Sequence, residues 1–303
     1  MRRTTIPPEI DTAECTGCGL CVQACPVFTL DMKDDKAFVD LGEMCIECGH
    51  CGAVCPVDAI VQKKAAVAPD LTVGEKPAVS PDVLMQLLRE RRSVRSYRKE
   101  PISREVLEQI INAGRYAPTG SNSQRVHYLV MTSPEEISEL GKEIMEFNAK
   151  FFKQLEKKPF ELLMSMFIGR KKIQELVNYA PGILRAQERI EAGEDPLLHH
   201  APAVLLVHAE DWDGSPAFNC AAAIYHCSLM AHVLGVGVCF NGWVENSVNN
   251  NKKLKNRLGI PKDNKCYGAM TMGYQDIKYR RLIERKQPDV QWRQPADSTD
   301  IIP

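Results

Sequence analysis

Eight of the twelve cysteines form the same pattern twice. The run CTGCGLCVQACP at 15–26 is followed by CIECGHCGAVCP at 45–56, so each cysteine of the first run recurs thirty residues later. Both runs have the spacing C-x2-C-x2-C-x3-C-P, which is typical of thiolate ligands to [4Fe-4S] clusters. The spacing therefore predicts two such clusters, and with them a chain that handles electrons one at a time.

Structural zinc and disulfide bonds are the alternative roles for these cysteines. Zinc sites usually use separated C-x2-C pairs, and two tight runs of four cysteines followed by proline fit them poorly. Disulfides need an oxidising compartment, yet no positively charged start with an apolar run follows Met1. We therefore expect clusters, and a cytoplasmic location.

The two runs resemble those of the bacterial two-cluster ferredoxins, in which the fourth cysteine of each run binds the other cluster. The resemblance implies one cluster on Cys15, Cys18, Cys21 and Cys55 and a second on Cys45, Cys48, Cys51 and Cys25. Glycines inside the runs would let backbone N–H groups approach the inorganic sulfide, where a Cβ would obstruct. They are Gly17, Gly19, Gly49 and Gly52.

The chain of 303 residues is too long for the cluster unit alone. We expect a cluster domain over residues 1–62, a linker over 63–80 that is rich in Ala, Pro, Lys and Val, and a second domain over 81–303. The net charge of -1 gives no reason to expect nucleic acid as a partner. No apolar run approaches the roughly 20 residues of a membrane span, so we expect no membrane partner either.

The second domain opens with a predicted helix and a group of arginines. Ser80, Pro81 and Asp82 are a helix start, and Val83, Leu84, Leu87 and Leu88 then form one apolar face. Five arginines follow around Ser93, namely Arg89, Arg91, Arg92, Arg95 and Arg98. Such a group is either a solvated surface or an anion site.

A polar loop follows the next predicted helix, residues 104–116, whose Val106, Leu107, Ile110 and Ile111 face a core. Pro118 ends this helix, and the sequence APTGSNSQ at 117–124 offers small side chains and free amides. This composition suits an ordinary turn, and it also suits contact with a flat polar heterocycle.

Two further segments are predicted to be helical. Residues 133–198 open with a capping box at Ser133 and carry apolar residues at helical spacing, some of which either fill a helical core or line a pocket. Residues 215–234 are rich in alanine, which suits either a helix buried in one subunit or a close helix contact between two. Gly235, Gly237 and Gly242 do not form the G-x-G-x-x-G fingerprint, so no Rossmann domain is expected.

In order and spacing, five segments of the second domain resemble the nitroreductase family of FMN-dependent flavoproteins. They are RRSVRSY at 91–97, APTGSNSQ at 117–124, HAPAVLLV at 200–207, LGVGVCFNGW at 234–243 and GYQDIKYRRLIERK at 273–286. With the N-terminal runs, the chain looks like a ferredoxin–nitroreductase fusion. The resemblance implies an α+β fold with a mainly antiparallel sheet flanked by helices, a helical lid at about 133–198, and a homodimer with FMN at the subunit interface.

The resemblance also implies the residues that contact FMN. The phosphate and ribityl chain would be held by Arg91, Arg92, Ser93, Arg95, Arg285 and Lys286, with Arg281 a further candidate. The partner subunit's loop would contact the flavin through Pro118, Thr119, Gly120, Asn122 and Gln124. Guanidinium groups match phosphate oxygens bidentately. This chain has Arg125 where the family usually has proline, and no catalytic acid or base is assigned.

These features predict an iron–sulfur flavoprotein that passes electrons between two [4Fe-4S] clusters and FMN to reduce a small organic acceptor. Candidate acceptors are nitroaromatics, quinones, activated alkenes and halogenated compounds, and the donor is an external reduced ferredoxin or another donor. One alternative is a reductase that takes hydride from NAD(P)H and exports electrons through the clusters. Another is a non-catalytic electron carrier or redox sensor. Cys220, Cys227, Cys239 and Cys266 lack ligand spacing and are expected to be buried small hydrophobes.

Overall fold

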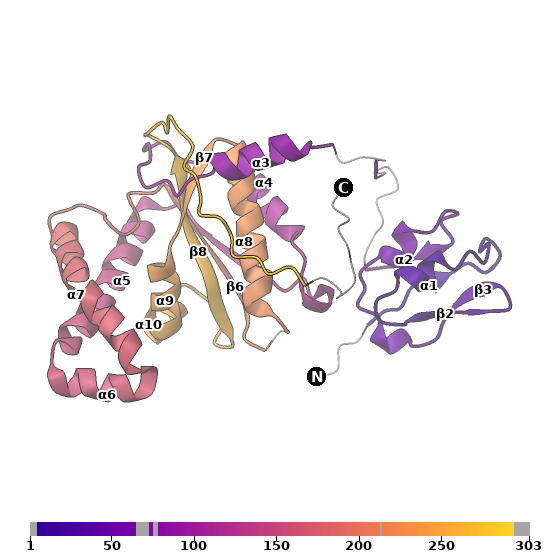
Figure 1. Cartoon of the computed structure of the whole chain (residues 1–303), viewed down its shortest axis with the longest axis horizontal. Helices are drawn as coiled ribbons and strands as arrows, with labels where there is room; N and C mark the ends of the chain where they lie inside the picture. The colour runs from indigo at the N-terminus through magenta and orange to yellow at the C-terminus, as the bar shows by residue number, and fades with distance from the viewer. Residues whose placement is uncertain (1–4, 65–72, 75–77, 213, 294–303) are drawn as a thin grey trace.

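A computed structural model describes residues 5–64, 73–74, 78–212 and 214–293. Figure 1 shows a small N-terminal unit beside a larger body that contains a central sheet. Much of the expected linker at 63–80 lies outside the described residues, as does the stretch 294–303.

The N-terminal unit consists of two antiparallel strand pairs and short helices. Its elements are β1 (Glu9–Ile10), α1 (Leu20–Ala24), β2 (Leu30–Lys33), β3 (Lys36–Val39), the 3-10 helix η1 (Gly42–Met44), α2 (His50–Ala53) and β4 (Ile60–Val61). β1 pairs with β4 and β2 pairs with β3. The buried core is small and consists mainly of Cys21, Leu30, Ala37 and Ile60. Because this unit buries so little apolar surface, we expect it to depend on the clusters predicted on its cysteines for stability.

The body is built on one antiparallel sheet with the strand order β5–β6–β8–β7. Its strands are β5 (His127–Met131), β6 (Ala203–Glu210), β7 (Val236–Phe240) and β8 (Asn264–Tyr274). In β6, Leu205 and Val207 enter one core whereas Val204 and Leu206 enter the other, because successive side chains point to opposite faces. The expected α+β fold with a mainly antiparallel sheet is confirmed.

Helices cover both faces of this sheet (Figure 1). One face packs against α4 (Arg104–Arg115) and α8 (Pro216–Val233). The other packs against α5 (Pro134–Leu155), α9 (Gly242–Asn250) and α10 (Lys252–Arg257). The remaining elements are α3 (Pro81–Glu90), the 3-10 helix η2 (Gly120–Asn122), α6 (Lys158–Ile168) and α7 (Arg170–Glu191).

The predicted helix starts are formed by serine caps. The hydroxyls of Ser80, Ser103 and Ser133 accept hydrogen bonds from the third following backbone N–H. The apolar face of α3 is only partly covered by the described residues, since Val83 and Leu84 are exposed whereas Leu87 and Leu88 are half-buried.

The segment expected to form a helical lid contains α5, α6 and α7. Phe152, Leu155 and Ile173 form a core between these helices, with Phe160 and Met164 packed against it. Met166, Phe167 and Tyr179 are instead exposed. The apolar residues of this segment are therefore divided between its core and its surface.

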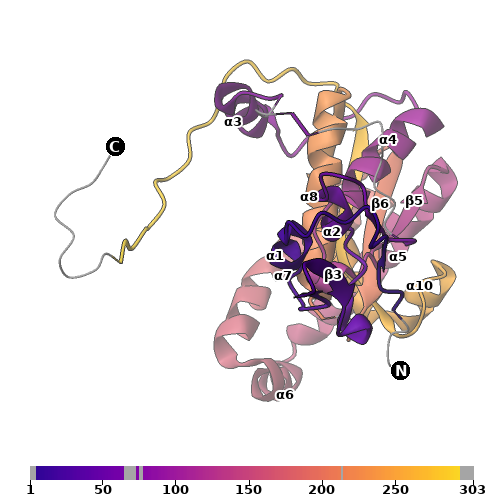
Figure 2. The same cartoon turned by 90° about the vertical axis from the view of Figure 1, so that its right-hand side faces the viewer.

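The chain after β8 first pairs with the segment after α3, through the Tyr97–Gln275 bridge, and then continues without helix or strand. Residues 275–293 are exposed throughout, and Figure 2 shows them running away from the sheet. Among the described residues, no helix is long and apolar enough to cross a membrane.

Candidate functional site

The structure gathers the eight cysteines of the two runs around two cavities. Cys15, Cys18, Cys21 and Cys55 line one of them. Cys25, Cys45, Cys48 and Cys51 line the other. The fourth cysteine of each run thus lies with the first three of the other run, as the ferredoxin resemblance implies.

The backbone around these cavities suits [4Fe-4S] clusters. Gly17 and Gly19 have φ of 74°, and a Cβ on Gly17 would meet the carbonyl oxygen of Asp35 at 2.2 Å. Backbone N–H groups of Thr29 and Glu47 donate to the Sγ atoms of Cys25 and Cys45 at 3.3 and 3.4 Å. In the described residues no three His, Cys, Asp or Glu side chains are placed to hold a single metal ion. Cluster thiolates bind four different irons, so they need no such convergence.

The arginine segment that follows α3 is fixed to the edge strand β7. The backbone N–H of Val94 donates to the carbonyl of Val238 at 2.9 Å, and Val94 is buried. A Cβ on Gly237 would lie only 2.7 Å from Val94, so glycine is what permits this contact. The Tyr97 hydroxyl donates to the carbonyl of Val94 at 2.6 Å and lies 2.8 Å from the Thr271 Oγ1 atom. These contacts fix the direction in which Arg91 and Arg92 leave the backbone.

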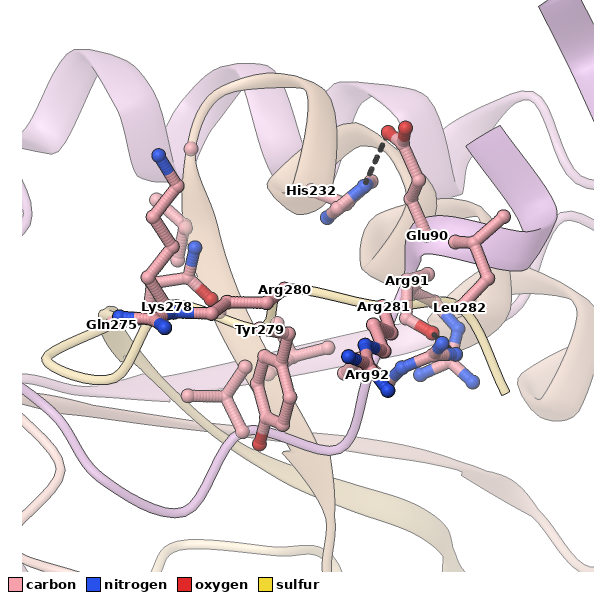
Figure 3. A pocket seen from close by; sticks show the side chains of 15 residues that line it. Glu90, Arg91, Arg92, His232, Gln275, Lys278, Tyr279, Arg280, Arg281 and Leu282 are labelled. Carbon is pink, nitrogen blue, oxygen red and sulfur yellow. Dashed lines mark hydrogen bonds and ion pairs between the residues drawn. The ribbon is translucent and has the colours of Figure 1, made fainter. Parts of the chain in front are cut away.

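Arg91 and Arg92 line a pocket of about 390 Å³ between α3, the end of α8 and the segment after β8. Figure 3 shows their guanidinium groups gathered with that of Arg281 at one end of the pocket. The Nε and Nη1 atoms of Arg91 and the Nε and Nη2 atoms of Arg92 are buried and have no hydrogen-bond partner. Buried donors are rarely left without a partner, so this pocket is built for an anion.

A phosphate group satisfies these unpartnered donors. Arg91, Arg92 and Arg281 supply planar donors, and Lys278 and Arg280 add positive charge along the same lining. Glu90 is the one acidic residue of the lining, and its Oε2 atom lies 4.0 Å from the Nε2 atom of His232. The pocket residues therefore fit the phosphate end of FMN.

The loop 117–124 lies at the other end of α8. The Asn219 carboxamide, which is buried in the first turn of α8, accepts a hydrogen bond from the Gly120 N–H at 2.9 Å. Its Nδ2 atom donates to the Ser123 hydroxyl at 3.4 Å. Asn219 was not singled out from the sequence, because only the fold brings it to a loop 99 residues away.

One chain does not bring the arginine pocket and this loop together. His232 lines the pocket and Asn219 holds the loop, and thirteen residues of helix separate them by about 20 Å. None of the predicted loop contacts lines the pocket. In one chain the predicted loop contacts and the arginine pocket thus lie at opposite ends of α8.

A second cavity, of about 620 Å³, lies beside Arg95 and the end of α7. Lys99, Arg189, His199 and His200 also line it. Both histidines have left-handed backbone, with φ of 61° and 51°, and the Asp195 carboxylate accepts from the His200 N–H at 2.9 Å. Burial lowers the pKa of His199, with the Asp195 charge opposing this effect and the Arg95 charge adding to it. His199 and His200 thus lie in a polar cavity.

Of the other residues expected to contact FMN, some lie in the lining of the arginine pocket and some do not. Ser93 pairs with Val238 at the edge of the sheet, beside the pocket but not in its lining. Arg281 lines the pocket, whereas Arg285 and Lys286 lie farther along the exposed segment and do not. The four cysteines outside the runs, Cys220, Cys227, Cys239 and Cys266, are buried as expected.

Comparison with known proteins decides the family. A model of the nitroreductase family matches residues 88–274, which is more than half of the chain. The chain belongs to the nitroreductase family. A 4Fe-4S dicluster domain matches residues 7–63. Together they confirm the expected fusion, and they confirm an FMN-dependent oxidoreductase with FMN and two [4Fe-4S] clusters as its cofactors.

Several individual proteins are similar to this member of the nitroreductase family. A protein of Archaeoglobus fulgidus named "Putative NADH dehydrogenase/NAD(P)H nitroreductase" is 25% identical over 207 residues, which cover 68% of this chain and 94% of that protein. A nitroreductase with bound FMN from Bacteroides fragilis is 22% identical, covers 72% of this chain and 98% of its own, and has a TM-score of 0.49. One from Desulfitobacterium hafniense, also with bound FMN, is 19% identical, with 68% and 97% covered and a TM-score of 0.48.

Proposed function

We propose that the protein is a reductase in which an external one-electron donor of the ferredoxin class loads the clusters and FMN delivers two electrons to a small organic acceptor. Nitroaromatics, quinones, activated alkenes and halogenated compounds are the candidate acceptor classes. The clusters supply one-electron chemistry, and bound FMN supplies the conversion between one-electron and two-electron steps. The thiolate ligands suit a reducing compartment such as the cytoplasm.

The single observation that carries this proposal is the set of buried, unpartnered guanidinium nitrogens of Arg91 and Arg92. An anion must satisfy them, and a phosphate there anchors FMN beside the segment 93–97. That segment runs from the arginine pocket to the cavity that contains Arg95 and His199. The flavin would thus extend along it, with the acceptor in the second cavity.

We propose that a homodimer completes the flavin site. α8 buries Cys220, Cys227 and Ala231 against its own sheet and exposes Phe218, Tyr225 and Val233 on the other side. An antiparallel contact between two copies of α8 would bring the loop at one helix start to the pocket at the other helix end. The partner's loop 117–124 would then contact the flavin whose phosphate Arg91 and Arg92 hold.

Anaerobic stopped-flow spectroscopy tests the direction of electron flow. Protein with all clusters and FMN in place is mixed with a reduced ferredoxin, and the cluster and flavin absorbances are followed separately. We expect cluster reduction first, flavin reduction second, and reoxidation of the flavin when nitroaromatic or quinone is added. If cluster and flavin never exchange electrons within a turnover, the proposal is wrong.

A second candidate function is an NAD(P)H-fed reductase that exports electrons through the clusters. The observation in its favour is the size of the second cavity, about 620 Å³, with the cations Arg95 and Lys99 in its lining. Mixing NADH or NADPH with the oxidised protein without oxygen separates the two candidates. Rapid bleaching of the flavin by a pyridine nucleotide supports this second function.

A further inference from the structure

The side chain of Asn122 joins the loop 117–124 (the flavin loop) to the N-terminal unit. Its Nδ2 atom donates to the carbonyl oxygens of Ile46 and Glu47 at 3.1 and 2.9 Å. A carboxamide has two N–H hydrogens, which is enough to donate to both carbonyls. Figure 1 shows the turn that follows α4 at the side of the body facing the N-terminal unit.

The two carbonyls that Asn122 contacts lie in a turn between two cysteines that are expected to bind the same cluster. Ile46 and Glu47 are the two residues between Cys45 and Cys48, so Glu47 is one Cα step of about 3.8 Å from Cys48. The equivalent turn of the first run contains Gly17, and it packs against the Asp35 carbonyl of its own unit. Of the two cysteine turns, the second is the one that meets the flavin loop.

The Cys45–Cys48 turn is held in a fixed shape. Glu47 has a left-handed backbone, with φ of 56°, and its side chain is buried. Its Oε1 atom accepts from the Ile6 N–H at 2.8 Å and lies 3.0 Å from the Lys64 Nζ atom. The Glu47 carboxylate thus contacts groups of the N-terminal unit, while the Glu47 carbonyl faces Asn122.

The flavin loop is equally constrained. Ser121, Asn122 and Gln124 all have φ between 49° and 51°, a region that costs energy for residues other than glycine. The Gln124 Nε2 atom donates to the Asn122 Oδ1 atom at 3.1 Å, which leaves the Asn122 amide to face Ile46 and Glu47. Strained backbone held by such contacts is typical of functional loops.

We propose that Asn122 is a positioning residue that docks the Cys45–Cys48 turn on the flavin loop. The cluster on Cys25, Cys45, Cys48 and Cys51 then becomes the one that exchanges electrons with FMN. With FMN bound, each exchange would oxidise the cluster by one electron, the external donor would re-reduce it through the other cluster, and two such exchanges with two protons would reduce FMN. The cluster on the first run serves the external donor. This inference rests on the proposed function of the clusters as the electron source.

The test removes this contact without adding backbone strain. Asn122→Gly deletes the carboxamide at a position whose left-handed backbone glycine adopts freely. Asn122→Asp keeps the acceptor for Gln124 and replaces the donor with a carboxylate that repels the two carbonyls. Asp34→Gly is the matched control, because Asp34 also has left-handed backbone but is exposed in the hairpin between β2 and β3.

Two measurements are made on full-length protein with clusters and FMN in place. Hydrogen exchange followed by mass spectrometry reports protection of residues 45–48, which needs no turnover. Laser-flash reduction of the clusters, followed at the flavin absorbance, reports the rate of electron transfer from cluster to flavin within the assembled protein. We expect both Asn122 variants to lose protection at 45–48 and to transfer electrons at least tenfold more slowly, with unchanged iron content and cluster potentials. The Asp34→Gly protein should behave as the parent does.

The outcomes separate this inference from the proposed function. If the parent protein transfers no electrons from cluster to flavin, the proposed function fails. If the parent transfers electrons and both Asn122 variants keep the same rate and the same protection at 45–48, only the docking role is wrong. Loss of FMN with unchanged protection would also overturn it, because Asn122 would then be a flavin contact alone.

Discussion

At the scale of single residues, the arginine pocket gives a direct prediction. Arg92→Ala removes two of the buried nitrogens that lack a partner, so FMN should bind more weakly. A hydrogen bond to a charged group contributes about 1.5–3 kcal/mol, which corresponds to a roughly 10- to 100-fold rise in Kd. Titration of apoprotein with FMN, followed by flavin fluorescence, measures this Kd. Arg104→Ala is the control, because Arg104 is exposed on α4 and forms a salt bridge with Glu108. An unchanged Kd in Arg92→Ala would refute the phosphate assignment.

Two glycines of the first cysteine run provide a matched pair. Gly17 and Gly19 share a φ of 74°, but a Cβ has open space at Gly19 and a backbone clash at Gly17. Gly19→Ala should therefore cost only the left-handed penalty of about 1–2 kcal/mol and keep its clusters. Gly17→Ala should lose the cluster on Cys15, Cys18, Cys21 and Cys55. Iron analysis and the visible absorbance of the purified proteins distinguish them, and equal cluster content in both would contradict the clash.

At the scale of elements, the β5–β6 pair contains a buried histidine with a large pKa shift. His208 is buried, stacks on His127 at 5.2 Å and lies 2.8 Å from the Asn264 Nδ2 atom. Burial, with the charges of His127 and Lys255, lowers the pKa of His208 from 6.5 to about 4. Between these two values the unfolded chain binds a proton that the folded chain does not, so stability falls as pH falls.

This pKa shift predicts a pH-dependent difference between the parent and His208→Gln. From pH 7.5 to pH 5 the parent should lose roughly 2 kcal/mol of unfolding free energy through His208 alone, a loss absent from the variant. Urea unfolding at several pH values, followed by the circular dichroism of the helices, measures both proteins. Parallel pH profiles for the two would show that His208 does not titrate differently on folding.

At the scale of the whole molecule, the exposed apolar face of α8 predicts the oligomeric state. Phe218→Glu places a charge on the face we expect a second copy to cover, so the dimer should dissociate. FMN affinity should fall with it, because the partner's loop is lost from the site. Sedimentation velocity and flavin titration on the same samples test both effects. Phe28→Glu, at an exposed phenylalanine of the N-terminal unit, is the control and should remain dimeric. A Phe218→Glu protein that stays dimeric would place the interface elsewhere.

Local chemistry explains what could be predicted. The serine caps of α3 and α5 act within three residues, so their positions could be inferred before the fold was known. The burial of strand β6 and of the alanine-rich helix α8 could be predicted from the apolar and small residues that compose them. By contrast, Asn219 takes its role from a contact 99 residues away, and no local pattern marks it. Asn122 was expected from its loop to contact FMN, but its contacts with residues 75 and 76 positions away come from the fold alone.

By itself the sequence determined the cofactor chemistry, because cluster ligands must come from thiolates at short, fixed spacing, and the motifs of the family lie in contiguous segments. Tertiary structure decided which groups meet. It placed Arg281 rather than Arg285 beside Arg91 and Arg92, set the loop at the far end of α8, and turned the Cys45–Cys48 side of the cluster unit toward Asn122. These outcomes depend on how rigid elements pack in space, which spacing along the chain does not encode.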